Sequence, residues 1–313
     1  MEVVYLPSIR SKHLDTLSYG LLATLHAIRS GVDVVDFRAT PLSWYALLTR
    51  SCGIPSIVWS QGPEWDRPKW GFVARLFLKS SEISSAYLPN AMVAVSRNLQ
   101  HYFERRFRRS VHFIPSGINP IHYAEPCEIL THGLSRGNYL LFLGRLDEAK
   151  GCGYLLDAYL RLKTDKRLVF AGGWQYSERY VARLRAAADH RVLFLGPVSG
   201  RLWQELFTNA YVYVQPSESE GISNSLLEAM SAGRCVVVSD IPGNVEAVGQ
   251  FAITFRAGDV DHLHRQLEYV LDNPEVVAAL GRRAQEHVQS HFSWDRSTDR
   301  LLSLYESLAT PRR

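Results

Sequence analysis

Short apolar runs alternate along the chain with helix-length amphipathic segments. This alternation is typical of a parallel sheet whose strands are joined by covering helices. In the first part of the chain the pattern predicts strands at residues 3–6, 32–37, 56–60, 92–95 and 111–114. Helices are predicted between them at residues 13–29, 42–51, 70–86 and 97–106. The first part therefore reads as an α/β domain.

The pattern stops in a Pro- and Gly-rich passage, residues 114–137, and then restarts. Six further strands are predicted at residues 139–143, 168–171, 192–195, 211–214, 236–239 and 252–255. Two long helical stretches, 274–290 and 294–308, have no strand after them. A chain of 313 residues has room for two α/β cores. We expect a first domain at 1–125, a linker at 126–138, a second domain at 139–293 and a C-terminal helix at 294–313.

Cysteine usage and the N-terminal residues bear on the compartment. Four cysteines are scattered without any paired short spacing, at positions Cys52, Cys127, Cys152 and Cys235. Neither a disulfide framework nor a zinc site is predicted, and a reducing cytoplasm fits. The first residues contain no basic start followed by a clean apolar core, and polar residues interrupt the stretch 17–28. We therefore predict no signal peptide, no spanning helix and a cytoplasmic location.

Positive charge is concentrated in the first part of the chain. Residues 1–130 hold 14 Lys+Arg and 10 Asp+Glu, and residues 131–313 hold 21 of each, so 14 minus 10 accounts for the whole net charge of +4. Four arginines cluster beside Phe103 and Phe107, at positions Arg105, Arg106, Arg108 and Arg109. This patch fits either anionic lipid headgroups or a diphosphate-bearing acceptor, and a solvated helix end is the alternative. Nucleic acid is disfavoured, because the pI of about 8.8 is modest and no nucleic-acid motif is present.

Glu220 and Glu228 bracket a segment that follows an apolar strand and opens a helix. Four residues of that segment have backbone N–H groups suited to an anion at the helix N-terminus: Gly221, Ile222, Ser223 and Asn224. The two carboxylates are then left to accept hydrogen bonds from hydroxyls. A ligand whose phosphate binds the amides and whose hydroxyls bind the carboxylates would be a nucleotide-sugar. Alternatively, Glu220 simply favours the helix dipole and Glu228 is a solvated residue. The apolar neighbours of Glu228 argue for burial, and a buried carboxylate needs a partner.

A second candidate phosphate site follows the strand at 139–143. Gly144 allows close approach of the backbone, and Arg145 and Lys150 can neutralise a diphosphate. The alternative is that these two cations pair with Asp147 and Glu148 on the surface. Glycines also end the next two strands, at Gly172, Gly173 and Gly196. They stand at the carboxyl edge of the predicted sheet, where open α/β folds bind ligands.

The order of these motifs resembles the retaining GT-B glycosyltransferases of family 4 over essentially the whole second domain. The matching strings are FLGRLDEAKG, VFAGG, FLGPVS and VQPSESEGISNSLLEAMSAG. The resemblance implies two Rossmann-like domains, with Arg145 and Lys150 binding the donor diphosphate. It further implies that Glu220 contacts the hydroxyls of the donor sugar and that Glu228 holds the ribose diol. The turn near Val198 would lie beside the base.

The first domain resembles a bacterial subgroup that includes rhamnosyltransferases of capsule and exopolysaccharide assembly. The strings are VVYLPSIRSKHLDTLSYG and GPEWDRPKWG, with Arg10, Ser11, Lys12, His13, Glu64, Trp65, Arg67, Lys69 and Trp70 carrying the likeness. For Trp70 we favour packing of the following helix. The acceptor-side candidates are His13, Gln61, Glu64, Arg67 and Lys69. Met1 aligns inside the family's first domain, so we expect that domain to be shortened by about one βαβ unit.

Gln61 is a departure, since many family members have His or Asp there and an amide cannot act as a base. The resemblance implies front-face transfer with retention, in which the departing diphosphate takes the acceptor proton; we expect no metal and no cofactor. The main hypothesis is transfer from a nucleotide-diphosphate sugar to a glycan or lipid-linked acceptor, with peripheral contact at the inner membrane face. The alternative is a truncated, non-catalytic nucleotide-sugar-binding or partner protein. A sugar-nucleotide epimerase is disfavoured by the Glu220/Glu228 pair, and rhamnose, glucose, galactose and mannose all stay open as donor sugars.

Overall fold

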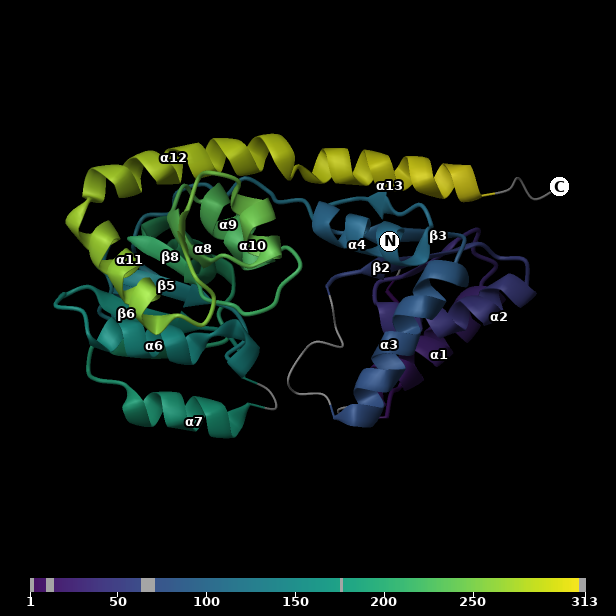
Figure 1. Ribbon diagram of the computed structural model, residues 1–313, viewed down its shortest axis with the longest axis horizontal. Helices are drawn as coiled ribbons and strands as arrows, with labels where there is room; N and C mark the ends of the chain where they lie inside the picture. The colour runs from purple at the N-terminus through teal and green to yellow at the C-terminus, as the bar shows by residue number, and fades with distance from the viewer. Residues whose placement is uncertain (1–2, 10–13, 63–70, 175–176, 310–313) are drawn as a thin grey trace. The chain divides into compact units, whose positions relative to one another are not determined.

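The computed structural model describes residues 3–9, 14–62, 71–174 and 177–309. The chain forms two compact units, which we call unit 1 (residues 1–115 and 295–313) and unit 2 (residues 116–294). Each unit consists of a parallel sheet with helices packed on it (Figure 1). The alternation of strands and helices expected from the sequence is therefore present in both.

The sheet of unit 1 has four parallel strands in the order β1-β2-β3-β4. They are β1 (Val35–Phe37), β2 (Ser56–Ser60), β3 (Ala91–Ala94) and β4 (His112–Phe113). The strand predicted at residues 3–6 is wrong, because residues 3–9 have no regular secondary structure. An apolar run becomes a strand only when a neighbour completes its hydrogen bonds, and this run pairs with none of the described strands. Tyr5 is accordingly 91% exposed.

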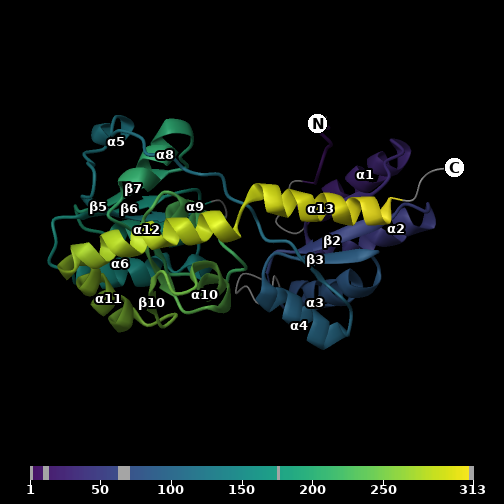
Figure 2. The same ribbon diagram turned by 90° about the horizontal axis from the view of Figure 1, so that it is seen from above.

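The helices of unit 1 follow the predicted segments closely. They are α1 (Asp15–Arg29), the 3-10 helix η1 (Thr40–Tyr45), α2 (Ala46–Ser51), α3 (Phe72–Tyr87) and α4 (Arg97–Phe107). The helix predicted at 42–51 is thus a 3-10 turn continued by a short α-helix. The C-terminal helix α13 (Trp294–Leu308) also packs on this sheet (Figure 2). Leu304 joins the core with Ile57 and Trp59, and Tyr305 Oη donates to Asp36 Oδ2 at 2.6 Å.

The sheet of unit 2 has six parallel strands in the order β10-β9-β8-β5-β6-β7. They are β5 (Tyr139–Leu143), β6 (Arg167–Ala171), β7 (Val192–Gly196), β8 (Val212–Gln215), β9 (Cys235–Ser239) and β10 (Ile253–Phe255). All six predicted strands are confirmed. The chain runs outward from β5 through β6 to β7, and then outward on the other side from β8 to β10. The strand order therefore reverses between β5 and β8, which is where open α/β sheets bind ligands.

Both faces of the unit 2 sheet are buried. Tyr139 and Leu141 lie in one core cluster, whereas Leu140 and Phe142 lie in another. Because side chains alternate along a strand, the two clusters occupy opposite faces of the sheet. The helices of this unit are α5 (Glu128–Thr131), η3 (Glu148–Lys150), α6 (Cys152–Leu160), α7 (Glu178–Ala187), α8 (Gly200–Asn209), α9 (Asn224–Ser231), α10 (Pro242–Val248), α11 (Val260–Asp272) and α12 (Pro274–His291).

The Pro- and Gly-rich passage is packed onto unit 2. It contains α5, and Ile129 and Leu134 are buried in the core of this unit. The carboxylate of Glu205, whose side chain is fully buried on α8, accepts hydrogen bonds from the backbone N–H groups of Cys127 at 2.8 Å and Ile129 at 3.1 Å. Prolines and glycines interrupt the periodic pattern here, but the apolar residues between them still bury themselves. Residues 126–138 thus form an ordered part of unit 2.

Candidate functional site

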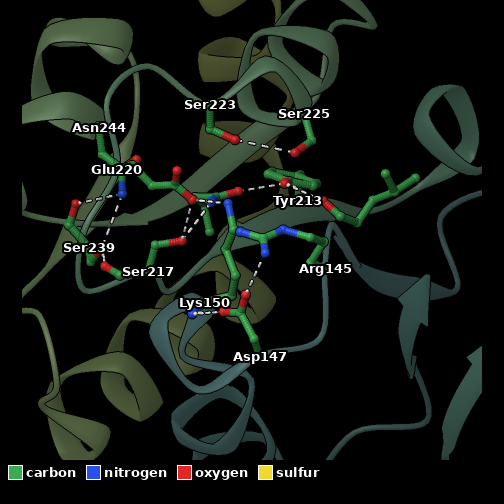
Figure 3. Close-up of polar contacts among 12 residues, drawn as sticks. Arg145, Asp147, Lys150, Tyr213, Ser217, Glu220, Ser223, Ser225, Ser239 and Asn244 are labelled. Atoms are coloured by element: carbon green, nitrogen blue, oxygen red, sulfur yellow. Dashed lines mark hydrogen bonds and ion pairs between the residues drawn. The ribbon is translucent and has the colours of Figure 1, made fainter. Parts of the chain in front are cut away.

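The loop that follows β8 holds Glu220 in a network of donors. Its Oε1 atom forms an ion pair with Lys150 and accepts hydrogen bonds from Ser217 Oγ at 3.2 Å and Gln215 Nε2 at 3.4 Å (Figure 3). The side chains of Lys150 and Glu220 are only 16% and 14% exposed. Charges that are largely removed from water need such partners. This carboxylate is therefore held in one position at the carboxyl end of the sheet.

The turn after β5 separates the two cations that the sequence groups together. Arg145 pairs with Asp147 at 3.3 Å and is 59% exposed, whereas Lys150 turns to Glu220. Asp147 also caps η3, accepting a hydrogen bond from the backbone N–H of Lys150 at 3.1 Å. The alternative of surface pairing therefore applies to Arg145 alone. An exposed arginine held by one carboxylate can turn to a phosphate at little cost.

The turn after β5 and the loop after β8 are locked together by close backbone contact. The backbone N–H of Glu218 donates to Ala149 O at 3.0 Å. Gly151 has a φ of +70°, and a Cβ there would lie 2.0 Å from Pro216 O. Only glycine allows that approach. Lys150 and Glu220 are thus brought together by the backbone as well as by their charges.

The glycine turns after β5, β6 and β7 stand side by side at the same edge. Gly144 N–H donates to Ala171 O at 2.9 Å, and Gly172 N–H donates to Gly196 O at 2.7 Å. A Cβ on Gly172, whose φ is +133°, would lie 1.9 Å from Gly144 O. Gly172 thus lets the turns after β5 and β6 approach each other closely, and the approach of a phosphate to Gly144 stays a prediction. Val198, in the turn after β7, is partly buried against the core of unit 2.

Helix α9 begins later than the sequence indicates. Its first residue is Asn224 and Ser223 is the N-cap, so Glu220 lies in the preceding loop and does not open the helix. The Ser223 side chain makes no capping bond to the helix, and its Oγ lies 3.2 Å from Ser225 Oγ (Figure 3). The first N–H groups of a helix lack partners in the preceding turn. Gly221 and Ile222, both buried, lead into this N-terminus.

The Gly221 loop is fixed from its other side by α10. A Cβ on Gly243 would lie 1.7 Å from Gly221 O and 2.5 Å from Glu220 O. The start of α10 therefore packs directly against the backbone that carries Glu220. Asn244, also on α10, donates to Ser239 O at 3.2 Å, and Ser239 Oγ donates to Ser217 O. These contacts place the ends of β8 and β9 in one connected group.

Glu228 lies on α9 and is partly buried, as its apolar neighbours predict. Burial raises the pKa of its carboxyl, and a hydrogen bond with the Trp203 side chain acts in the opposite direction. The partner that the sequence requires is therefore Trp203 of α8. A carboxylate has two oxygens that can each accept more than one hydrogen bond, so Glu228 is suited to accept hydrogen bonds from hydroxyl groups as well.

Several contributors were missed by sequence reasoning. Tyr213 is fully buried, and its hydroxyl donates to Leu143 O at 3.1 Å or Gln215 Oε1 at 2.6 Å; burial raises its pKa. Gln215 in turn orients Ser217 through Nε2 at 2.7 Å. The available signal was their position: Gln215 ends β8 and Ser217 follows it, at the carboxyl edge of the sheet.

The acceptor-side candidates belong to unit 1. Gln61 directly follows β2 and is exposed. His13, Glu64, Arg67 and Lys69 lie outside the described residues, as do the other residues that carry the subgroup likeness.

In the ranges given above, no group of three or more His, Cys, Asp or Glu side chains is arranged to hold a metal ion. Over the same ranges, the structure contains no helix with the length and apolar character needed to span a bilayer.

The geometry defines an α/β protein with cations, a helix N-terminus and two carboxylates gathered at a topological switch point of unit 2. Residues 132–287, which contain all of these groups, match the family model described as "Glycosyl transferases group 1". The likeness to that family thus lies within unit 2.

Two curated relatives illustrate the sequence similarity. The lipopolysaccharide core biosynthesis mannosyltransferase LpcC of Rhizobium leguminosarum bv. viciae is 32% identical over 126 residues, 39% of this chain and 35% of that protein. The O-antigen chain mannosyltransferase B of Escherichia coli is 28% identical over 179 residues, 54% of this chain and 46% of the other. The chain spans about half, or less, of the length of the curated relatives it matches.

Among solved structures, Anabaena HepE in complex with UDP-glucose superposes with a TM-score of 0.79 at 17% identity, covering 93% of this chain and 82% of the other. At this identity the likeness concerns the fold. The predicted class, two Rossmann-like domains in the GT-B manner, is confirmed.

Proposed function

We propose that this protein is a glycosyltransferase that moves a sugar from a nucleotide-diphosphate donor to a glycan or lipid-linked acceptor. The observation that carries the proposal is the gathering of Lys150, Glu220 and the α9 N-terminus at the carboxyl edge of the unit 2 sheet. Cations and free amides bind phosphate oxygens, and carboxylates bind sugar hydroxyls. A nucleotide-sugar carries both kinds of group.

Each residue has a role in this proposal. Arg145 leaves Asp147 to contact the diphosphate, and the amides of Ser223 and Asn224 point at the same group. Glu220 accepts hydrogen bonds from the transferred sugar while Lys150 neutralises the leaving oxygen. Glu228 accepts from the ribose hydroxyls, which relieves the cost of its half-buried charge. Gly144 and Gly172 provide close backbone approach, and Val198 packs beside the base.

The chemistry we propose is transfer with retention. The bond between the anomeric carbon and the diphosphate oxygen breaks while the acceptor oxygen bonds to the same face of that carbon. The acceptor proton passes to the departing diphosphate, so no protein carboxylate has to act as a nucleophile. Arg145, Lys150 and the α9 amides stabilise the negative charge that develops on the leaving group.

The relatives support a pathway without identifying the sugar. LpcC and the O-antigen enzyme are named as mannosyltransferases, and HepE was solved with UDP-glucose. Together with the subgroup likeness to rhamnosyltransferases, these names favour the assembly of a cell-surface polysaccharide. We place the reaction at the cytoplasmic face of the membrane, with peripheral contact to the lipid that carries the acceptor.

The test is calorimetric titration with a panel of UDP-, GDP- and dTDP-sugars. Arg145→Ala and Glu228→Ala should each weaken binding of the preferred donor at least ~10-fold, since a hydrogen bond to a charged group contributes about 1.5–3 kcal/mol. Arg161→Ala is the matched control, because Arg161 is also a half-exposed arginine of unit 2 paired with one carboxylate, Asp261. Unchanged affinity in Arg145→Ala, or an equal loss in Arg161→Ala, would contradict the assignment.

Turnover separates the enzyme from the alternative hypothesis. Release of the nucleoside diphosphate in the presence of a lipid-linked acceptor supports transfer. Donor binding with no release under any acceptor would instead favour a non-catalytic nucleotide-sugar-binding protein.

A further inference from the structure

Helix α3 of unit 1 exposes a row of large apolar side chains along one face. Phe72, Leu76, Ile83 and Tyr87 recur at helical spacing, and Val73 lies beside the first of them. Their exposed fractions are 82%, 62%, 53%, 48% and 79%, respectively. Contiguous exposed apolar surface of this kind marks a site of interaction.

The opposite face of α3 is buried in unit 1, so the apolar row faces outward. Leu78, Ser81 and Ser85 are buried on that face. Ser43 Oγ of η1 donates to Ser81 O at 3.2 Å and contacts Ser84 Oγ at 2.5 Å. Rotating α3 to hide the apolar row would expose these buried residues and break their hydrogen bonds. The row is therefore a fixed surface of the folded unit.

Positive charges accompany the apolar row. Arg75 and Lys79 are exposed on α3 itself. The row ends at Tyr87, whose hydroxyl donates to Phe107 O at 3.1 Å at the end of α4. The Arg109 guanidinium lies 5.9 Å from the Tyr87 ring centroid, within cation–π distance. The apolar row thus continues into the arginine cluster noted in the sequence.

The end of α4 presents that cluster to solvent. Arg108 has a left-handed backbone, φ 53°, which ends the helix and turns the chain. Four arginines around this turn are exposed: Arg105, Arg106, Arg108 and Arg109. The alternative of a solvated helix end does not explain why Arg109 lies over the aromatic ring that ends the apolar row.

The two acidic residues of α3 and α4 are directed inward. Glu82 is buried and accepts a hydrogen bond from Tyr102 Oη at 3.1 Å. Glu104 accepts from Gln100 Nε2 and from the backbone N–H of Val111, both at 3.3 Å. The surface formed by the α3 row and the α4 arginines is consequently apolar and positive.

We propose that this surface, which we call the α3–α4 face, docks the protein on an anionic lipid bilayer. A helix with an apolar face bordered by Lys and Arg lies in the plane of the lipid headgroups, with its apolar side chains inserted and its cations on the phosphates. Phe72 and Tyr87 at the two ends suit the interface, where aromatic rings are enriched. The apolar row favours lipid over a purely charged partner, and the arginines distinguish this face from the exposed leucines of α1.

The α3–α4 face is the part of the protein that would make the membrane contact of the proposed function, so this proposal rests on that part of the proposed function. It does not depend on donor binding. The α3–α4 face belongs to unit 1, and the donor-side residues belong to unit 2. Vesicle binding can therefore be measured without any nucleotide-sugar. The two proposals can fail separately.

The experiment is co-sedimentation of the full chain with phosphatidylglycerol/phosphatidylcholine vesicles and with phosphatidylcholine vesicles alone. We expect binding to the anionic vesicles that falls as salt is raised, because exposed charges are screened. The double variant Arg105→Glu/Arg109→Glu should lower the partition coefficient at least ~25-fold, at ~5-fold for each cation lost from an anionic surface. Ile83→Glu should reduce binding to a similar degree by placing a carboxylate in the apolar row.

Matched variants keep the test specific. Leu302→Glu changes a residue of unit 1 that is 50% exposed, close to the 53% of Ile83, and should bind as the unmodified chain does. Arg265→Glu/Arg282→Glu makes the same change of charge at two exposed arginines of unit 2 and should also leave binding intact. All of these variants should keep the unfolding temperature of the unmodified chain.

Several results would overturn the proposal. They are no binding to anionic vesicles, equal binding to phosphatidylcholine alone, or equal losses in the control variants. Light scattering that shows a dimer dissociated by Ile83→Glu would assign the face to a second copy of the chain instead.

Discussion

The two units share an architecture and differ in how completely it is covered. In unit 2 the six-stranded sheet is buried on both faces, and glycines let the loops at its carboxyl edge interlock. In unit 1 the strands are two to five residues long, and this unit carries most of the large apolar side chains that the described residues expose. One unit therefore holds a small polar site in fixed geometry, whereas the other offers an extended surface.

The units also differ in how they hold buried charge. Glu220 of unit 2 is surrounded by Lys150, Ser217 and Gln215 next to a proposed ligand site. Asp36 of unit 1 is held by Arg38 at 2.8 Å and by Tyr305 of the C-terminal helix. The first arrangement positions a carboxylate for a ligand, and the second fastens a helix to a sheet. The same chemistry thus serves binding in one unit and folding in the other.

The largest expected effect tests the tight packing of unit 2. Gly243→Ala would place a Cβ 1.7 Å from Gly221 O, a backbone atom that cannot move away without shifting Glu220. We expect a loss of about 3 kcal/mol in the free energy of unfolding, at the upper end for overpacked sites, and weaker donor binding. Calorimetric unfolding and donor titration measure the two effects.

Gly153→Ala is the control for that substitution. Its nearest atom, Tyr180 Oη, lies 3.5 Å from the new Cβ, and the position is helical. We expect unchanged or slightly increased stability, since alanine favours a helix over glycine. Equal effects of the two substitutions on stability and on donor binding would contradict the close packing of α10 against the 220–221 loop.

An intermediate effect concerns the attachment of α13 to unit 1. Tyr305→Phe removes the hydroxyl that donates to Asp36 Oδ2 at 2.6 Å. A hydrogen bond to a charged group contributes about 1.5–3 kcal/mol, so we expect a loss of ~1.5 kcal/mol in the stability of unit 1. Urea unfolding monitored by a spectroscopic probe in unit 1, or thermal unfolding in a calorimeter, measures this loss.

The same variant has a defined pH signature. Burial raises the pKa of Asp36, and the Tyr305 hydrogen bond lowers it. A carboxyl with a raised pKa in the folded state favours folding most when protonated, so its contribution falls as pH rises from its ordinary value through the raised one. Tyr305→Phe should raise the Asp36 pKa further and extend that window upward. Carboxyl carbon NMR titration of Asp36 would refute this account if the pKa fell.

The smallest expected effect tests whether the Glu228 site of unit 2 favours ligand binding over stability. Burial raises the pKa of Glu228, so its contribution to stability also declines as pH rises through that pKa. Glu228→Gln should therefore make the donor-free protein slightly more stable at neutral pH, with a flatter pH dependence above the ordinary carboxyl pKa, and should weaken donor binding. Exposed Glu286→Gln on α12 is the control. Thermal unfolding of the two variants at several pH values measures the stability effect. A destabilised Glu228→Gln variant would point to a structural role for Glu228.

The sequence was most informative where its signal was local. Apolar run lengths and glycines at strand ends located all six strands of unit 2, because these strands are buried on both faces and are continuous apolar runs. It failed at residues 3–6, where an equally apolar run has no neighbouring strand to pair with in the described structure. Whether such a run becomes a strand depends on its partner, which a local pattern does not contain.

The candidate site shows the same limit at the level of side chains. The sequence singled out Arg145, Lys150, Glu220 and Glu228 by residue type and spacing. It could not tell that Lys150 pairs with Glu220, seventy positions away, while Arg145 pairs with Asp147. The partner of Glu228, Trp203, comes from another helix. Contacts between distant segments follow from the strand order, and strand order is a property of the folded sheet.

The amino-acid sequence by itself determined the class of the protein: alternating strands and helices, glycine turns at the strand ends and the polar residues that follow them. Those features depend on neighbours within a few positions, where backbone preference and burial act directly. Tertiary structure decided which charges meet, where α9 begins and that the C-terminal helix completes unit 1. It also turned the apolar row of α3 outward beside the α4 arginines, because a surface is formed only when separate helices are packed against a common core.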